Sequence, residues 1–223
     1  ILKKVVIIGD KSSAILISDY IYDAAKRFNE SIEVMGFASD NFPVESMLNG
    51  FPVLCKTRNV FNKFKKDNSV KFIYQMYNIK KMKAAIENKN KLGIPDERYL
   101  KFIHPSCYVA KSASIGHGTI ILANSVVNSN ARVGSFNSIM TGVTIGHDAV
   151  VGNYNLIATQ AVVANILMGD RNFIGINATT NNKIKIGDDC MIGMASNVTK
   201  DVASGVKCFG NPAKEVKTPK NLN

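Results

Sequence analysis

The chain has 223 residues, of which 46% are hydrophobic and 20% are charged, as in a globular protein of one large or two small domains rather than a disordered chain. No apolar run approaches the roughly 20 residues that span a membrane, and the first residues lack a signal-peptide layout, so we expect a cytoplasmic protein without membrane insertion. The net charge of +11 favours anionic partners. Because no nucleic-acid-binding module is recognisable, phosphorylated small molecules are expected rather than nucleic acid.

Residues 1–100 alternate between strand and helix signals. An apolar run at residues 4–9 ends on Gly9 and predicts a buried strand, and Ser12 with Ser13 offers an N-cap for a helix that reaches residue 28. Further elements are expected as a strand at 32–37, a helix at 60–66, a strand at 70–77 and a helix at 78–89. This alternation predicts a small parallel α/β sheet of the βαβ, Rossmann-like type.

From residue 103 onward an aliphatic side chain recurs at every sixth position. The phase slips by one residue between Val163 and Met168, and Thr180 is the one member that is not aliphatic. A small side chain usually follows four residues later. The recurring positions are Ile103, Val109, Ile115, Ile121, Val127, Val133, Ile139, Ile145, Val151, Ile157, Val163, Met168, Ile174, Thr180, Ile186, Ile192 and Val198.

A period of six fits neither a helix nor an alternating strand, but it does fit a solenoid of triangular coils, with about 18 residues in each coil. The recurring side chain points inward and stacks on its neighbours, so that the coils together bury a core that one repeat could not bury. We therefore expect an α/β domain at 1–100, a parallel β-helix at 101–207 and a C-terminal cap at 208–223. The slip after Val163 predicts an irregular turn on a functional face.

Three histidines are the candidates for a general base, the group that acyl transfer to an amine requires. His104 precedes a proline at the entry to the solenoid and is expected to be structural. His117 and His147 occupy the same position of the repeat, but only His147 is followed by a carboxylate, Asp148, which can orient the ring. Asn165 lies 18 residues after His147, so it should sit beside His147 in the next coil.

Metal and disulfide chemistry are not expected. The histidines are 13 and 30 residues apart, and neither spacing is a multiple of 18, so the coils would not bring them together as zinc ligands. The four cysteines are scattered and contain no CxxC pair, which favours reduced thiols over a disulfide framework.

The chain resembles bacterial sugar acyltransferases of the sialic-acid O-acetyltransferase type, whose relatives include bacillosamine and perosamine nucleotide-sugar N-acetyltransferases. The resemblance runs from the βαβ segment to the Asn211-Pro212 tail and centres on the stretch from Thr141 to Asp148. It implies a left-handed β-helix, a homotrimer, acetyl-CoA bound between adjacent β-helices, and His147 as base with Asp148 as its partner. It also implies that Asn165 lies near the acceptor amine. The residues that it assigns to CoA are Gly175, Asn177, Gly193, Pro212, Ala213 and Lys214.

In the same family the N-terminal domain holds the nucleotide. The usual Gly-x-Gly-Gly loop reads Gly9-Asp10-Lys11-Ser12-Ser13 here, so its later glycines are missing, although Ser12, Ser13 and a helix N-terminus can still supply donors. The resemblance assigns the remaining nucleotide contacts to Asp40, Asn78 and Lys81.

The function expected is therefore N-acetylation of a nucleotide-linked deoxyamino sugar by direct attack on acetyl-CoA, in the synthesis of a surface polysaccharide such as O-antigen. Two alternatives stay open. The first is the same fold acting on a sugar hydroxyl, as in sialic acid. The second is a trimeric β-helix scaffold without catalytic activity.

Overall fold

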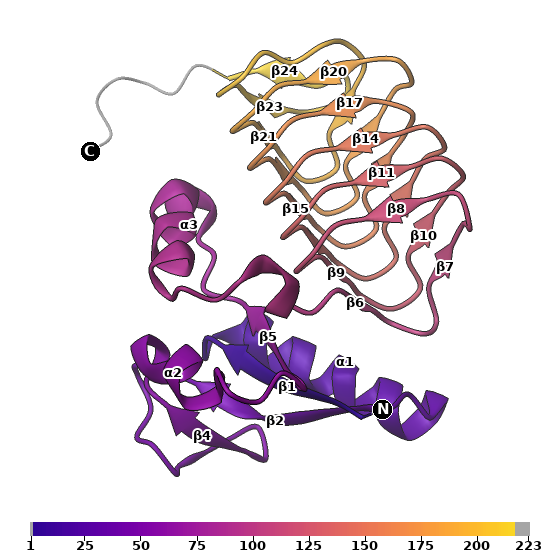
Figure 1. The fold of residues 1–223 in the computed structure, drawn as a ribbon. Helices are drawn as coiled ribbons and strands as arrows, with labels where there is room; N and C mark the ends of the chain where they lie inside the picture. Colours follow the sequence, from indigo (N-terminus) through magenta and orange to yellow (C-terminus); the bar gives the residue numbers. More distant parts are fainter. Residues whose placement is uncertain (1, 217–223) are drawn as a thin grey trace. The chain divides into compact units, whose positions relative to one another are not determined.

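The computed structural model describes residues 2–216, and the chain divides into two compact units, Ile1–Pro105 and Ser106–Asn223 (Figure 1). Residues 217–223 of the expected C-terminal cap lie outside the described residues. None of the helices within residues 2–216 is long and apolar enough to cross a membrane.

The first unit is an α/β sheet with the strand order β3-β4-β2-β1-β5. Strands β4, β2, β1 and β5 are parallel, and β3 is antiparallel to β4. The parallel βαβ arrangement is confirmed, whereas the β3–β4 hairpin is an addition that the sequence pattern did not reveal. The elements are β1 (Lys3–Ile8), α1 (Ser12–Phe28), β2 (Ile32–Ala38), β3 (Met47–Leu48), β4 (Phe51–Cys55), η1 (Thr57–Asn59), α2 (Val60–Phe64), β5 (Val70–Tyr74), η2 (Ile79–Lys81), α3 (Met82–Lys91), η3 (Asp96–Arg98) and β6 (Phe102–Ile103).

The expected N-cap of α1 is wrong. Ser12 is the first helical residue, and the N-cap position belongs to Lys11, whose side chain makes no capping hydrogen bond. Apolar side chains on one face of α1, among them Ile17 and Ile21, are buried, and this packing stabilises the helix without a side-chain cap.

Arg98 links the start of β5 to residues 64–68, which precede it, through hydrogen bonds. Its buried guanidinium group donates hydrogen bonds to the main-chain oxygens of Phe64, Asp67 and Val70 at 2.9–3.2 Å and to the Asn68 side chain at 3.2 Å. One side chain therefore satisfies carbonyl groups that a packed interior would otherwise leave without donors.

We expect Arg98→Ala to lower the free energy of unfolding of the first unit by about 2–4 kcal/mol, because several buried acceptors lose their donor at once. Urea titration of the full chain, with hydrogen exchange followed in β5, measures the effect. The exposed Arg58 provides a matched control, since Arg58→Ala should change stability by less than about 0.5 kcal/mol. Equal β5 protection in the Arg98 variant and the wild type would contradict this role.

The second unit is a β-helix whose short strands form three sheets, which are parallel except for the final pair, β23 and β24. Partners lie in consecutive coils, as Val127 does with Ile145 and Ile145 with Val163. The inward position is buried in every coil from Ile121 to Val198, so the period of six is confirmed as the core. The first sheet contains β7 (Tyr108–Val109), β10 (Val126–Val127), β13 (Thr144–Ile145), β16 (Val162–Val163), β19 (Thr179–Thr180) and β22 (Asn197–Val198).

The other two sheets follow the same plan. The second contains β8 (Ser114–Ile115), β11 (Arg132–Val133), β14 (Val150–Val151), β17 (Leu167–Met168) and β20 (Lys185–Ile186). Within this unit the third contains β9 (Ile120–Ile121), β12 (Ser138–Ile139), β15 (Leu156–Ile157), β18 (Phe173–Ile174), β21 (Met191–Ile192), β23 (Lys207–Phe209) and β24 (Lys214–Glu215).

The coil ends later than expected. Cys208 is buried in β23, which pairs in parallel with β21, so it still belongs to the solenoid rather than to a cap. The chain turns back only after Phe209, and β24 then pairs antiparallel with β23.

A buried asparagine ladder runs along one side of the solenoid. The main-chain N–H of Asn155 donates to Oδ1 of Asn137 at 2.8 Å, and the N–H of Asn172 donates to Oδ1 of Asn155 at 2.8 Å. These residues occupy the position that elsewhere holds small side chains, and Cys190 continues the ladder by donating to Asn172. The side-chain amides thus link coils whose turns would otherwise leave buried N–H groups unpaired.

Candidate active site

Turns join the three sheets at three edges of the triangular coil, and each edge collects a different set of the residues singled out above. The histidine edge consists of the turns 110–113, 128–131, 146–149, 164–166 and 181–184. The glycine edge consists of the turns 122–125, 140–143, 158–161, 175–178, 193–196 and 210–213. Because the coils stack in register, residues of one edge form columns that run from coil to coil.

His147 and Asp148 stand on the histidine edge and are paired with each other. Nδ1 of His147 lies 2.7 Å from Oδ2 of Asp148, and the two side chains are 67% and 50% exposed. Asp148 has a φ of 58°, a left-handed conformation that Asp adopts more readily than most residues. A turn residue in this conformation can direct its carboxylate back onto the preceding side chain, and here it does so.

Hydrogen bonds from His147, and then from Asn130, lower the pKa of Asp148 below its ordinary value. Asp148 is therefore a carboxylate at neutral pH and can only accept, so Nδ1 of His147 carries the proton between them. Within residues 2–216 no group is hydrogen-bonded to Nε2 of His147. In the neutral ring this tautomer leaves Nε2 as the acceptor nitrogen, and the side chain is 67% exposed, which is the arrangement that a general base requires.

The turn that follows in the next coil is one residue shorter than its neighbours. Each complete turn from Gly118 to Ala195 contains one residue with positive φ, but the turn 164–166 lacks it. Asn165 takes the place that His147 has one coil earlier. The turn of Asn165 contains no residue that corresponds to Asp148. Asn165 is half-buried, its N–H donates to Asn182 Oδ1 at 3.2 Å, and its carbonyl accepts from Lys183 at 2.7 Å.

The shortened turn also explains why Thr180 interrupts the aliphatic series. The N–H of Ala164 donates to Oγ1 of the buried Thr180 at 2.9 Å, whereas the equivalent N–H of Gly146 donates to the main-chain oxygen of Val163. An aliphatic residue at position 180 could not accept this bond. Thr180 therefore supports the local geometry of the turn that holds Asn165.

The glycine edge brings together the residues that the resemblance assigned to CoA. Gly175 and Asn177 lie in one coil, Gly193 in the next, and Pro212 with Ala213 in the one after that. The N–H of Ala213 donates to Asn197 at 2.8 Å, and Lys214 begins β24 with its side chain exposed. A Cβ at Gly175 would lie 2.5 Å from the Met194 nitrogen, so coil stacking by itself requires this glycine.

In the first unit, the residues after β1 and β5 meet at the carboxyl end of the sheet because these two strands are neighbours. Gly9 follows β1 with a φ of +128°, and a Cβ there would lie 2.9 Å from the Gln75 oxygen. Ser12 and Ser13 form the first turn of α1. From β1 the chain continues to β2 on one side, and after β5 it returns at Tyr99, which bridges Phe72 on the other side of β5. Open α/β sheets bind ligands at such points where the strand order reverses.

The other nucleotide candidates make contacts of their own. Asp40 is bonded to the N–H of Thr57 at 3.0 Å and to the Thr57 hydroxyl, so both of its oxygens already hold η1. Oδ1 of Asn78 accepts from the Lys80 N–H at 3.0 Å, and Lys81 is exposed at the N-cap of α3. These candidates all follow the carboxyl ends of the parallel strands β1, β2 and β5, and Asp40 differs from the others because its carboxylate also holds η1.

His104 and three of the four cysteines are buried, unlike His147. His104 is buried, and its Nε2 lies 3.1 Å from Asp23. Burial raises the pKa of the Cys55, Cys190 and Cys208 thiols, which makes them poor nucleophiles. Within residues 2–216 no three His, Cys, Asp or Glu side chains are grouped as metal ligands.

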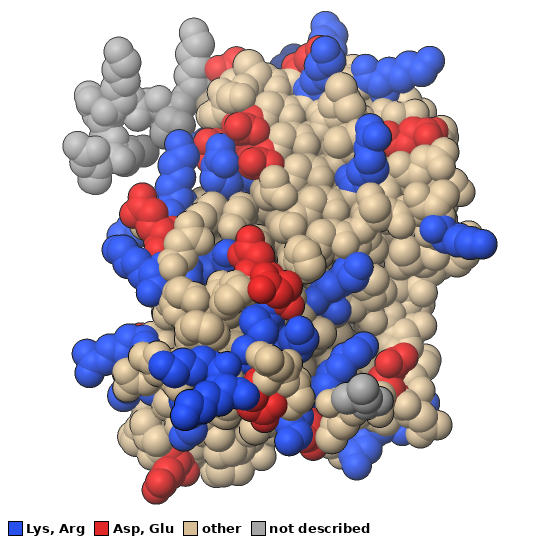
Figure 2. Space-filling model, in the orientation of Figure 1, with Lys and Arg blue, Asp and Glu red and all other residues tan. Residues whose placement is uncertain are grey.

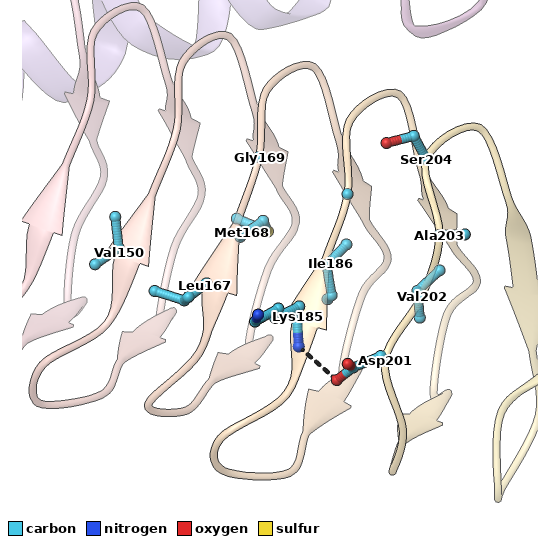
Figure 3. A pocket seen from close by; sticks show the side chains of 11 residues that line it. Val150, Leu167, Met168, Gly169, Lys185, Ile186, Asp201, Val202, Ala203 and Ser204 are labelled. Atoms are coloured by element: carbon cyan, nitrogen blue, oxygen red, sulfur yellow. Dashed lines mark hydrogen bonds between the residues drawn. The ribbon is translucent and has the colours of Figure 1, made fainter.

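A groove that the sequence did not indicate lies on the second sheet (Figure 3). Its volume is about 670 Å³, and its apolar wall includes Val150, Leu167, Ile186 and Val202. At its rim the main-chain N–H of Lys185 donates to Asp201 at 2.8 Å. Strands β14, β17 and β20 enter this face directly from the histidine edge, so the groove lies beside the turns of His147 and Asn165.

No family model matches the chain, and no curated protein matches it. Solved structures do share its fold. The acetyltransferase domain of PglB from Neisseria gonorrhoeae FA1090 is 24% identical with a TM-score of 0.80, over 96% of this chain and 100% of that one. In complex with acetyl coenzyme A, the same domain matches at 22% identity and a TM-score of 0.72, over the same shares.

Two further structures are similar over nearly the whole length. A variant of perosamine N-acetyltransferase from Caulobacter crescentus, in complex with CoA and GDP-perosamine, is 20% identical with a TM-score of 0.72, over 96% of this chain and 97% of that one. WeeI from Acinetobacter baumannii AYE is 23% identical with a TM-score of 0.76, over 95% and 99%. The fold is therefore an N-terminal α/β sheet followed by a left-handed β-helix.

Proposed function

We propose that the chain is a bacterial sugar acetyltransferase that transfers acetyl from acetyl-CoA to the amino group of a nucleotide-linked deoxyamino sugar. The observation that carries the proposal is the His147–Asp148 pair, in which Nδ1 lies 2.7 Å from the carboxylate and the His147 side chain is 67% exposed. The pair stands on a fold shared with a domain solved with acetyl coenzyme A and with an enzyme solved with CoA and GDP-perosamine.

The proposed reaction is a direct transfer. The amine nitrogen attacks the thioester carbonyl carbon, and a C–N bond forms while the C–S bond breaks. One amine proton passes to Nε2 of His147 and then to the departing sulfur, which leaves as the thiol. Asp148 stabilises the imidazolium that exists between these two transfers. Asn165, one coil away, is proposed to hold the amine or the acyl oxygen.

The nucleotide is assigned to the carboxyl end of the first unit's sheet. Residues 1–105 contain 18 Lys and Arg against 11 Asp and Glu, and residues 106–223 contain 10 against 6, so most of the positive charge belongs to the unit that would meet phosphates. Figure 2 shows many of these basic side chains on the surface. Lys81 and the first turn of α1 are the groups proposed to contact the diphosphate.

CoA is assigned to the glycine edge, at Gly175, Asn177, Gly193, Pro212, Ala213 and Lys214. This edge and the histidine edge are separated within one chain by a face of the coil, up to about 20 Å of extended backbone. The two edges can line one groove if the histidine edge of one chain meets the glycine edge of another. This geometry supports a homotrimer with three identical grooves.

The test is the release of CoA thiol from acetyl-CoA with a panel of UDP-, dTDP- and GDP-linked 4-amino sugars, and with sialic acid as a hydroxyl acceptor. We expect turnover with one nucleotide-linked amine, and its nucleotide identifies the specificity of the first unit. Turnover with sialic acid alone would transfer the assignment to O-acetylation. If no acceptor causes release of CoA thiol, the result would contradict an acetyltransferase and favour a scaffold.

A further inference from the structure

Asn130 lies on the histidine edge one coil before Asp148. Its side-chain Nδ2 donates to Oδ1 of Asp148 at 3.0 Å, while Oδ2 of the same carboxylate is bound to Nδ1 of His147 at 2.7 Å. Each oxygen of Asp148 therefore has its own donor. Two donors on opposite oxygens fix the plane of a carboxylate, which one donor alone would leave free to rotate.

Asn130 is itself held in place from the preceding coil. Its main-chain N–H donates to Oγ of Ser112 at 3.0 Å, and its φ of 59° places it in the left-handed region that Asn tolerates. Ser112, Asn130 and Asp148 are spaced 18 residues apart, which is one coil, so they form a single column along the edge. Through Asp148, the hydrogen bonds of this column connect the His147 imidazole to the stacked coils of the β-helix.

We propose that Asn130 is a positioning residue, which orients the Asp148 carboxylate and through it the His147 ring. The proposal rests on the acetyltransferase function for its kinetic consequence, but the hydrogen-bond relay can be tested without turnover. A neutral amide suits this place because it donates to a carboxylate without adding a charge that would neutralise it. A lysine here would compete with the imidazolium for the same carboxylate.

The chain offers a matched control at Asn124. This residue also has a positive φ, 60°, and its N–H also donates to a serine one coil earlier, Ser106 Oγ at 3.0 Å. One coil later, however, its column continues with Gly142, so it has no carboxylate to orient, and it lies three coils before Asn177, where the residues proposed to bind CoA begin. Glycine adopts positive φ without strain, so Asn→Gly at either position removes the amide and retains the turn.

The experiment compares Asn130→Gly and Asn124→Gly with the wild type in two measurements. The first is steady-state kinetics, in which Asn130→Gly should lower kcat about three- to tenfold and leave both KM values within about twofold, because orientation rather than binding is lost. The second is a carboxyl-carbon NMR titration, assigned with Asp148→Asn, in which Asn130→Gly should raise the pKa of Asp148. Asn124→Gly should change neither.

A second variant, Asn130→Asp, replaces the donor by a like charge of similar size and should lower kcat further than glycine does. An Asp148 titration that is the same in Asn130→Gly and the wild type would overturn the relay, as would an unchanged kcat in an active enzyme. If the wild type turns over no acceptor, the proposed function fails. The titration would still decide whether Asn130 orients Asp148.

Discussion

Replacement of His147 by alanine is expected to lower kcat for acetyl transfer by about 100- to 10,000-fold, the range associated with the loss of a general base. The reason is geometric. Nε2 of His147 is the accessible nitrogen of a ring whose other nitrogen is bound to a carboxylate. The amine then has no positioned group to take its proton, although both substrates can still bind, so KM should change little.

His117 is the control for this experiment. It occupies the same position of the repeat, two residues after an inward aliphatic side chain, and it is also exposed, but the residue after it is Gly118. His117→Ala should retain wild-type kinetics. Comparable activity of His147→Ala and the wild type would eliminate the base assignment, whereas an equal loss in both variants would indicate damage to the fold rather than to the chemistry.

The second large effect that we expect is the return of activity when two inactive variants are combined in one trimer. His147→Ala disables the histidine edge, and Asn177→Glu places a negative charge on the glycine edge where CoA phosphates are proposed to bind. If each site combines the histidine edge of one chain with the glycine edge of the next, a trimer that contains both variants has one native site of three. Activity should therefore return to about one third of the wild-type value.

The two variants are co-expressed with different affinity tags and purified through both tags, so that every assembly contains both chains. The matched control pairs His147→Ala with Asn165→Ala. Both changes lie on the histidine edge, so no site is repaired and activity should remain at the level of the parent variants. Failure of the first pair to recover, or a purified protein with a single chain, would contradict a site shared between copies.

The sequence determined the β-helix because its signal repeats. The inward position recurs at every sixth residue from Ile121 to Val198, apart from the slip after Val163, and it is aliphatic except at Thr180. It is buried throughout, and no helix or simple strand has this period. The same arithmetic placed Asn165 one coil after His147. Counting 18 residues back from Asp148 leads to Asn130, so the sequence also contained the signal for this contact.

Other features were decided by tertiary structure alone. In the β3–β4 hairpin, β3 has only two residues, and β4 is an apolar run that contains Pro52, so neither strand shows alternation. The Ser12-Ser13 cap prediction was wrong because Ser12 is already helical, and α1 is stabilised by packing of its buried face. Asp40 is a matching acidic residue by sequence, but Thr57, which lies 17 residues later, satisfies its carboxylate. Periodic local patterns are readable from the sequence because each repeat meets the same neighbours. Single long-range hydrogen bonds depend on where the chain returns in space, and only the folded structure supplies that information.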